Sequence, residues 1–338
     1  MHSIHIWFNR TFSTTYNIIQ DLRKAGLPYE LKFFGTHPNL QSVFLKACHI
    51  IETEPVLEDD AYIKYALDFC KKHKIDLFFP GEFSSTLIAK NVHLFEDQGI
   101  KIGLAFKSDV ADILSSKIQT YEALRPVLPK LIPKFHCIQN VKDFQKVYHE
   151  QKAVNVLTCL KPDRGLGGLG FRVIDDKVDQ FSQLLNYPSH SNTFDYYYQI
   201  LSDVGEFTPL IFMEYLHGPE ISVDCLARNG QLLFSVAREK RGKYRVVKQV
   251  PYLHQICAEI CATFSLNYIF NVQFRFGKDG QIYLLDLNAR PSGGIYYAHK
   301  AGYKMMSAAI STILGEPFVS FGFFPEQTFM QIEDAISC

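Results

Sequence analysis

The sequence has 338 residues, of which 47% are hydrophobic, 14% aromatic and 21% charged. This composition is typical of globular proteins and excludes a collagen, a coiled coil or a disordered chain as the overall class. The 35 Lys and Arg residues balance 35 Asp and Glu residues, so the zero net charge argues against bulk binding to nucleic acid or membrane surfaces. No apolar run approaches the roughly 18 residues that a membrane-spanning helix needs.

The N-terminus and the cysteines predict a cytoplasmic protein. Residues 1–8 lack the basic start and the apolar stretch of a secretory signal. Eight cysteines are scattered without a Cys-x-x-Cys pair or the spacing of a zinc site, and most of them lie in apolar stretches. We therefore expect reduced, buried thiols.

Strands and helices alternate along the first third of the chain. We expect strands at 3–8, 29–34, 75–79 and 100–105, and helices from Thr14 or Thr15 to Lys24, from Asp59 or Asp60 to Lys74, and from Ser84 to about Asp97. This alternation predicts a parallel sheet covered by helices, so we interpret residues 1–106 as one α/β domain. Ligands bind such sheets at the carboxyl ends of the strands, which places Asn9–Thr11 and Gly81–Glu82 at the functional edge.

The rest of the chain has a mixed α+β pattern. We expect a helix from Ser108 that carries Lys117, and three prolines make 125–133 a linker. Further strands are expected at 134–138, 154–161, 171–174, 209–215, 219–227, 231–238, 244–249, 271–276 and 281–288, and further helices at 141–150, 176–186, 194–203, 252–264 and 295–314. A glycine-rich turn makes the last two strands a hairpin. Residues beyond about 314 give little signal.

A glycine-rich segment lies between two of these strands. Gly165, Gly167 and Gly170 match G-x-G-x-x-G, which in a dinucleotide-binding site leads directly into a helix. Residues 171–174 are strand-like instead, so we reject that interpretation. A strand–loop–strand hairpin lets backbone amides approach phosphate oxygens, and the preceding Lys161 would add a point charge for ATP phosphates. A flexible hairpin with an exposed lysine is the equally weighted alternative.

Polar residues alternate at the end of the last strand. Asp286, Asn288 and Arg290 are spaced by two, which places them on one face of an extended strand. Pairing across the turn would bring Gln273 to the same face. One carboxylate and two amide oxygens suit Mg²⁺, and Arg290 would contact a phosphate. A polar, solvent-exposed strand end is the alternative, and the leucines between these positions argue against it.

The segment from Glu214 to Asp224 runs from a strand through a turn into a second strand. Its chain edge at 214–216 would offer backbone groups to an adenine, and Glu220 would accept hydrogen bonds from ribose hydroxyls. Taken alone, an ordinary exposed hairpin is the preferred interpretation.

In this order, these segments resemble the ATP-grasp superfamily, with the closest similarity to the synthetase modules of carbamoyl-phosphate synthase and to stand-alone carboxylate–amine ligases. The resemblance covers nearly the whole chain and rests on 116–120, 160–170, 214–224, 272–274 and 285–293. It implies a parallel-sheet pre-ATP-grasp α/β domain at 1–106 and a two-lobed ATP-grasp domain at 107–338. The small lid lobe would span about 130–212 and the large lobe about 213–320.

The resemblance implies a role for each matching residue. ATP phosphates would be held by Lys117, Lys161 and the flap with Gly167 and Gly168, and adenine would be surrounded by Met213, Glu214, Tyr215 and Leu216. The ribose would be bound by Glu220. One or two Mg²⁺ ions, which Mn²⁺ can replace, would be held by Gln273, Asp286 and Asn288, and the transferred phosphoryl group would be stabilised by Arg290. Asp286 stands where the family usually has the longer Glu.

Six basic residues lie between 238 and 248, and Arg238 and Arg241 are our candidates for contacting the phosphoryl group or the carboxylate. A solvated hairpin is an equally weighted alternative, and nucleic-acid binding is the least favoured one.

The implied activity is that of an ADP-forming ligase. ATP would convert a carboxylate or bicarbonate to an acyl phosphate, which an amine or similar nucleophile then attacks. A nucleotide-binding regulatory protein without turnover and a small-molecule kinase are the alternatives. We expect small-molecule carboxylate and amine substrates and no nucleic-acid or membrane partner, and a homodimer is compatible with the resemblance.

Overall fold

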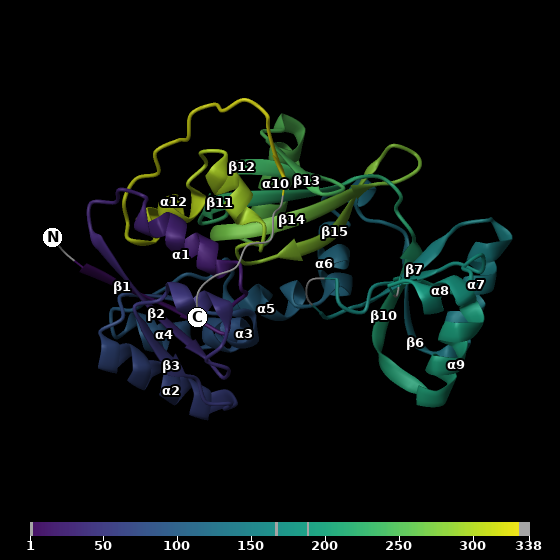
Figure 1. The fold of residues 1–338 in the computed structure, drawn as a ribbon, viewed down its shortest axis with the longest axis horizontal. Coiled ribbons are helices and arrows are strands. Elements are labelled where there is room, and N and C mark those ends of the chain that lie inside the picture. Colours follow the sequence, from purple (N-terminus) through teal and green to yellow (C-terminus); the bar gives the residue numbers. More distant parts are fainter. Residues whose placement is uncertain (1–2, 166–167, 188, 331–338) are drawn as a thin grey trace. The chain divides into compact units, whose positions relative to one another are not determined.

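The computed structural model describes residues 3–165, 168–187 and 189–330. The chain divides into two compact units. The first unit comprises 1–112, 220–273 and 287–338, and the second comprises 113–219 and 274–286. Their helices and strands are labelled in Figure 1. None of the helices in the described ranges combines the length and the apolar character that crossing a membrane requires.

The first unit begins with a five-stranded parallel sheet. Its strands are β1 (Ser3–Asn9), β2 (Glu30–His37), β3 (Ile50–Thr53), β4 (Leu77–Phe79) and β5 (Lys101–Ile102), in the order β3-β2-β1-β4-β5. The sheet confirms the predicted α/β class of the N-terminal part, and β3 is a strand that the pattern did not predict. Successive strands add on one side of β1 and then, from β4, on the other. The loops that follow β1 and β4 therefore flank the point where a parallel sheet usually binds its ligand.

Helices cover both faces of this sheet. They are α1 (Thr15–Arg23), the short 3₁₀ helix η1 (Val43–Ala47), α2 (Asp59–His73), α3 (Glu82–Lys90) and α4 (Val92–Glu96), followed by α5 (Ser108–Leu114). Ile6 and Phe8 pack on the side of α1, whereas Trp7 between them points to the opposite side and stacks on Phe78 with 3.9 Å between ring centroids. The helix expected from Ser84 to Asp97 is two helices, because α3 ends at Lys90 and α4 begins at Val92, with Asn91 capping both.

The second sheet of the first unit has six strands. They are β11 (Glu220–Arg228), β12 (Gln231–Arg241), β13 (Tyr244–Lys248), β14 (Tyr268–Phe276), β15 (Ile282–Asn288) and β16 (Gln327–Met330), in the order β15-β14-β11-β12-β13-β16. The ends of β14 and β15 that adjoin their connecting turn belong to the second unit. Strand β16 lies where the sequence gave little signal, and it pairs antiparallel with β13.

Helices also lie on both faces of the six-stranded sheet. They are α10 (Pro251–Thr263), α11 (Ile295–Lys300) and α12 (Met305–Ile313). Ser235 of β12 bonds to His254 of α10 (2.9 Å), whereas its neighbour Phe234 packs on Tyr303, between α11 and α12. Adjacent strand residues point to opposite faces, so these helices cover opposite faces of the sheet. The helix expected at 295–314 is thus two helices joined by a short turn.

The second unit is built on a five-stranded sheet. Its strands are β6 (Phe135–Asn140), β7 (Thr158–Pro162), β8 (Arg172–Ile174), β9 (Ser191–Asn192) and β10 (Glu206–Glu214), in the order β6-β10-β7-β8-β9; its helices are α6 (Lys117–Leu124), η2 (Pro129–Leu131), α7 (Val141–Ala153), α8 (Gln180–Leu185) and α9 (Phe194–Val204). Strands β7 and β8 form an antiparallel hairpin around the glycine-rich segment, which confirms that no helix follows the glycines.

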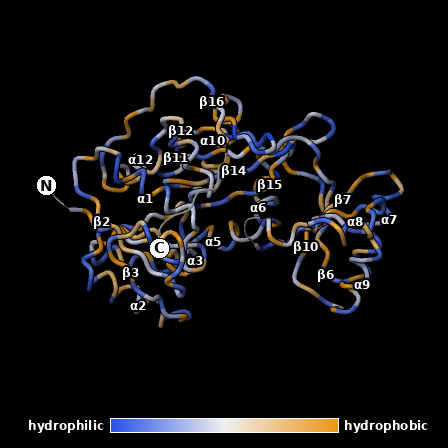
Figure 2. Tube along the Cα trace, in the orientation of Figure 1, coloured by the Kyte–Doolittle hydropathy of each residue, from blue (hydrophilic) through white to orange (hydrophobic). Residues whose placement is uncertain are grey.

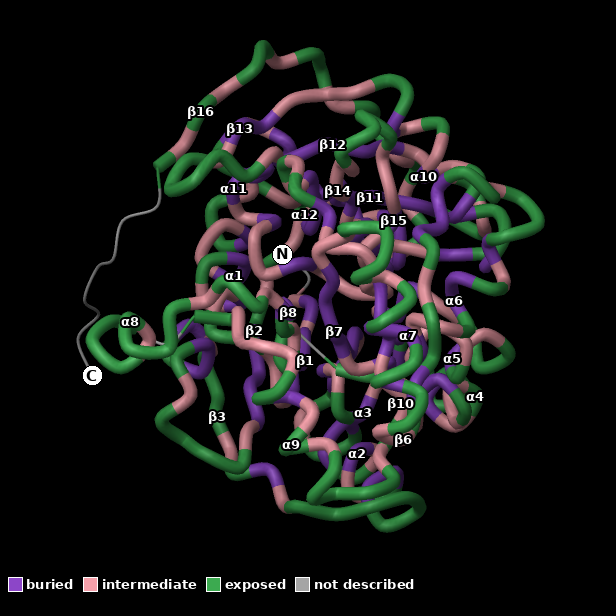
Figure 3. Tube along the Cα trace, turned by 90° about the vertical axis from the view of Figure 1, so that its right-hand side faces the viewer, coloured by how far each residue is buried: buried purple, intermediate pink, exposed green. Residues whose placement is uncertain are grey.

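Burial is deepest on the inner strands, such as β4, β7 and β11, whereas the edge strands β3 and β16 have no buried residue. Figure 3 colours the chain by burial, and Figure 2 colours it by hydropathy. The core of the second unit is formed largely by α7, α9 and the strands under them, with Phe144 stacked on Phe194 (5.2 Å). All seven cysteines in the described part of the chain are free, and five of them are buried. Burial raises the pKa of the Cys159 thiol to about 12, which agrees with an inert core thiol.

The sheet and the helices of the second unit are joined by Asp176. Its carboxylate accepts hydrogen bonds from Tyr148 Oη, from Lys152 Nζ (2.8 Å) and from the backbone N–H of Phe194 (3.0 Å). Burial acts to raise the pKa of Asp176, but the hydrogen bonds outweigh it and lower the pKa to about 2.

Because an unfolded aspartate titrates at about 3.9, this carboxylate stabilises the fold fully above about pH 4 and loses its contribution as the pH falls towards about 2. We therefore expect the unfolding free energy of Asp176→Asn to fall less steeply than that of the wild type over this interval, in urea titrations at each pH. Asp203→Asn, a change at an exposed aspartate of α9, is the control. Equal slopes for wild type and Asp176→Asn would contradict the assignment.

Candidate active site

In the second unit, Asp163 fixes the start of α6. Ser116, the N-cap residue, donates through Oγ to the Asp163 carboxylate (2.8 Å) and accepts from the backbone N–H of Gln119 (3.1 Å). Asp163 Oδ1 also accepts from the N–H of Ile118 (2.8 Å), and its carbonyl accepts from the N–H of Lys117 (3.2 Å). The helix predicted to run from Ser108 through Lys117 is therefore interrupted, and Lys117 is the first residue of a new helix tied to the end of β7.

The structure brings Lys117 next to Asp286. The Lys117 ammonium donates to the carbonyl of Gly165 (3.1 Å) and lies 3.6 Å from Asp286 Oδ1. These residues were predicted for different tasks, one for a phosphate and one for a metal ion. Their proximity allows a cation on Asp286 and a phosphate on Lys117 to be bound side by side.

Lys161 is buried beside the same strand. Its ammonium donates to Tyr121 Oη (2.7 Å) and to the backbone carbonyl of Leu285 (2.9 Å). Burial lowers the pKa of Lys161, and Asp286 acts in the opposite direction by favouring the charged form. Burial also raises the pKa of Tyr121 well above its usual value, so the phenol stays neutral and accepts from the ammonium. Two lysines, a carboxylate and a neutral phenol thus meet within one unit.

The glycine-rich hairpin follows Lys161. Gly168 and Gly170 have φ angles of +78° and +77°, which favour glycine, and a Cβ atom on Gly170 would collide with the Pro162 ring. Gly168 is exposed. Gly167, which was also expected to bind phosphate, lies outside the described residues.

The predicted adenine segment spans the end of β10 and the residues after it. Met213 and Leu216 are buried, and Glu214 and Tyr215 are half-buried. The Tyr215 N–H donates to the carbonyl of Leu157 (2.8 Å), and the Arg275 guanidinium lies 5.3 Å from the centre of the Tyr215 ring. Glu220 is the half-buried first residue of β11, in the first unit.

In the first unit, Arg290 follows β15. Its guanidinium donates to Asn288 Oδ1 (3.2 Å) and to Glu82 Oε2, and it lies 4.7 Å from the centre of the Phe12 ring. Sequence reasoning had assigned Arg290 and Asn288 to one site, and they are in contact here. Glu82, expected at the functional edge of the first sheet, is added to this pair.

Arg238, which was expected to contact the phosphoryl group or the carboxylate, lies in a buried cluster of the first unit. Its guanidinium donates to Asp224 through Nε (2.6 Å) and to Ser292 Oγ (2.8 Å). Asn271 also donates to Asp224 (2.9 Å). A Cβ atom at Gly294 would collide with the Arg238 guanidinium, so a side chain at that position would push the guanidinium away from its partners. Arg238 thereby ties β12 to the loop after Arg290, whereas Arg241 is exposed and bonds to Glu239 (2.7 Å).

The predicted metal ligands occupy β14 and β15. Gln273 is half-buried in β14, and Asp286 and Asn288 are two residues apart in β15, which neighbours β14 in the sheet. No group of three or more His, Cys, Asp and Glu side chains that suits a metal ion occurs within the described ranges. One carboxylate with two amide oxygens is an oxygen donor set that fits Mg²⁺ with water ligands completing its shell.

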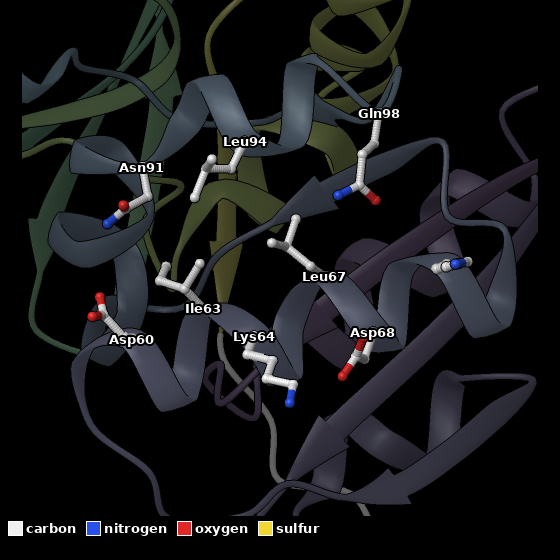
Figure 4. A pocket seen from close by; sticks show the side chains of 9 residues that line it. Asp60, Ile63, Lys64, Leu67, Asp68, Asn91, Leu94 and Gln98 are labelled. Atoms are coloured by element: carbon white, nitrogen blue, oxygen red, sulfur yellow. The ribbon is translucent and has the colours of Figure 1, made fainter.

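Several surface hollows lie on the N-terminal part of the first unit. One, of about 250 Å³, is at the carboxyl ends of the strands and is lined in part by Arg10, Glu54, Tyr62 and Ser84. Glu54 is buried, with Arg10 Nε 2.8 Å from its carboxylate. Another is a groove of about 700 Å³ between α2 and the helices after β4, where Figure 4 shows Leu67 and Leu94 flanked by charged and amide side chains. None of the predicted site residues lines this groove.

Sequence reasoning missed Tyr121 and Asp163. The pattern Ser116-x-x-Gln119 is that of a capping box and would have indicated a helix start at Lys117. Nothing in the sequence marks Tyr121, which reaches Lys161 only through the fold.

We expect Tyr121→Phe to lower the unfolding free energy by about 1–3 kcal/mol, because the buried Lys161 ammonium loses an acceptor. Urea denaturation of the full chain measures this effect. Tyr187→Phe is the matched control in the same unit, since that tyrosine is 98% exposed and should change nothing. If both variants unfold like the wild type, Tyr121 does not support Lys161.

Part of the sequence is similar to a known protein family. Residues 206–334 match a family described as ATP-grasp in the biosynthetic pathway with Ter operon. No curated protein matches the sequence.

Several solved structures share the fold. N5-carboxyaminoimidazole synthetase from Staphylococcus aureus complexed with ADP has a TM-score of 0.70 at 14% identity, over 97% of this chain and 82% of that one. L-amino acid ligase from Bacillus licheniformis has a TM-score of 0.65 at 15% identity, over 93% and 75%. The biotin carboxylase domain of Hydrogenobacter thermophilus 2-oxoglutarate carboxylase, in complex with MgADP, ADP and bicarbonate, has a TM-score of 0.64 at 14% identity, over 94% and 71%.

Proposed function

Because residues 206–334 match an ATP-grasp family and the chain shares its fold with solved ligases, we propose that it is an ATP-grasp protein and an ADP-forming ligase that activates a carboxylate or bicarbonate for attack by an amine or similar nucleophile. The observation that carries the proposal is the meeting of Lys117, Lys161 and Asp286 within one unit, at the foot of the glycine-rich hairpin. Similar structures bind ADP, and in one case bicarbonate, which supports this choice of substrates.

Each residue receives a role in the proposal. The ATP phosphates are bound by Lys117 and Lys161 under a flap with Gly167 and Gly168. The adenine is surrounded by Met213, Glu214, Tyr215 and Leu216, and the ribose is bound by Glu220. One or two ions of Mg²⁺ or Mn²⁺ are held by Gln273, Asp286 and Asn288. When bound, Mg²⁺ neutralises charge on the phosphate oxygens. The buried Lys161 carries its positive charge in a place poor in water, where it attracts a phosphate more strongly than an exposed lysine does.

The proposed reaction has two steps. A carboxylate oxygen attacks the γ-phosphorus of ATP, the bond to the β-phosphate oxygen breaks, and ADP leaves. The nucleophile then attacks the carbonyl carbon of the acyl phosphate, loses a proton and displaces inorganic phosphate. Arg290 stabilises the phosphoryl group as it moves between oxygens. The acceptor binds near the carboxyl ends of the first sheet, where Arg10 lines a hollow.

We also propose that Arg238 contacts the phosphoryl group or the carboxylate of the acceptor. Its guanidinium already bonds to Asp224 and Ser292, so a catalytic role would have to use its remaining N–H groups. We further propose a cytoplasmic protein that acts on small molecules, binds neither nucleic acid nor a membrane, and is compatible with a homodimer.

ADP release from Mg-ATP tests the function. We expect release that depends on one addition when bicarbonate, amino acids and a small-metabolite extract are added in turn. The rate of ADP release should fall by about a hundredfold or more in Lys161→Ala, because this variant lacks the buried ammonium that binds a phosphate of ATP. Lys142→Ala, at an exposed position of α7, should release ADP like the wild type.

The products distinguish the alternatives. A ligase forms a joined product with ADP and phosphate, whereas a small-molecule kinase forms ADP and a stable phosphoester. Nucleotide binding without any ADP release would instead support a regulatory protein and contradict the ligase.

Ligand-induced stabilisation tests the site itself. Mg-ATP at about 100 times its Kd should raise the unfolding free energy by roughly 2.7 kcal/mol, because it binds the folded state alone. Thermal denaturation with and without Mg-ATP should show a smaller shift in Lys161→Ala and in Asp286→Ala. An undiminished shift in both variants would refute the residue assignment.

A further inference from the structure

The guanidinium of Arg290 is held from two sides by residues of the first 106 positions. Its Nε donates to Glu82 Oε2, and the Phe12 ring lies against the guanidinium, 4.7 Å from Cζ to the ring centre. Phe12 lies in the loop after β1, and Glu82 is the first residue of α3, directly after β4. The contacts thus come from the two loops at which the winding of the first sheet reverses.

The position of Glu82 is set by buried backbone. The N–H of Gly81 donates to the side-chain carbonyl of Asn9 (2.6 Å), which is itself buried. A Cβ atom on Gly81 would collide with the backbone carbonyls of Asn9 and Arg10, so only glycine allows this approach. The α3 turn continues from there, since Ser84 N–H donates to the Gly81 carbonyl (3.1 Å). The carboxylate is consequently carried by a rigid start of a helix.

Fold stability does not explain the ion pair. The Glu82 side chain is 36% exposed and the Arg290 side chain 19% exposed. Ion pairs this close to water contribute little to folding, because both ions are well solvated when apart. The contacts do explain how the Arg290 guanidinium is oriented. Its Nε donates to Glu82 and its Nη2 donates to Asn288, while Nη1 has only a long contact of 3.5 Å to the carbonyl of Pro291. The guanidinium has more N–H groups than these partners use, so its far edge can still bind an anion.

We infer that Glu82 and Phe12 are positioning residues for Arg290. They orient its guanidinium so that the Nη1 edge meets the transferred phosphoryl group. The inference rests on the proposed function, in which Arg290 stabilises that group. The inference gives the loops of the N-terminal sheet a second function. Besides contacting the acceptor, they would set the geometry of phosphoryl transfer.

The test uses a mimic of the transferred phosphoryl group and needs no knowledge of the acceptor. Isothermal titration calorimetry of the full chain measures the affinity for MgADP alone and for MgADP with aluminium fluoride. We expect Glu82→Ala to lose roughly tenfold or more of the affinity gained with fluoride, because a misplaced guanidinium stabilises the developing charge poorly. Glu82→Gln, which keeps an acceptor oxygen for Nε, should lose less, and Phe12→Leu should lose about two- to threefold. The affinity for MgADP alone should stay within about twofold in each variant, which also shows that the variant is folded.

A double-mutant cycle separates positioning from a general structural effect. If Glu82 acts through Arg290, then Glu82→Ala should have no further effect on fluoride-dependent affinity in an Arg290→Ala background. Glu96→Ala, at an exposed glutamate of α4 in the same unit, is the control and should match the wild type.

Three results would overturn the inference. An unchanged fluoride-dependent gain in Glu82→Ala shows that Arg290 needs no such support. An increased gain shows that Glu82 competes with the phosphoryl group. Additive losses in the double mutant show that Glu82 acts independently of Arg290. If the wild type itself gains nothing from aluminium fluoride, the proposed function fails, and the inference fails with it.

Discussion

Burial of the Lys161 ammonium is the constraint around which the second unit's site is built. An ion removed from water is stable only where hydrogen-bond acceptors and opposite charge replace the lost solvent. Here Tyr121 of α6 and the Leu285 carbonyl of β15 supply the acceptors, and Asp286 supplies the charge. Helix α6, β7 and β15 must therefore meet at one point. Their meeting also brings Lys117 to Asp286, so a single compensated charge organises the proposed phosphate-binding region.

The first unit depends on a second buried charge. Asp224 is fully buried and is surrounded by donors from Arg238, Asn271 and Ser292. These donors come from β12, β14 and the loop after β15, so the carboxylate fixes where that loop begins. Arg290 stands just before the loop and is held on its other side by the N-terminal sheet. The buried pair of Asp224 with Arg238 and the partly exposed pair of Glu82 with Arg290 thus both contact the short segment at 290–292.

The class of fold and most elements were predictable from the sequence, because hydrophobic periodicity, prolines and glycines act locally. The parallel sheet and the hairpin around the glycines are examples. Strand β16 was not predicted, because its pairing with β13 depends on tertiary contacts. The break before Lys117 was overlooked although its capping pattern is visible in the sequence. Candidate site residues within motifs could be proposed from the sequence, whereas Tyr121, Asp163 and the contact of Glu82 with Arg290 could not. Each of those three acts on a partner 40 or more positions away, and no local pattern reports such a contact.

The discontinuous composition of the first unit bears on how the chain folds during synthesis. Ile18 and Leu22 of α1 belong to the same core as Ile295 and Met306, which the ribosome adds only after residues 113–219 of the second unit. Until then the inner face of α1 has no permanent cover, whereas the second unit draws nearly all of its residues from one middle segment and can complete its core earlier. Domains generally fold in the order of their synthesis, and exposed apolar surface makes intermediates prone to aggregation. For these two units the order is inverted: residues 1–112 are translated before 113–219 but become fully packed after them, and a chaperone that shields α1 would be most useful in that interval.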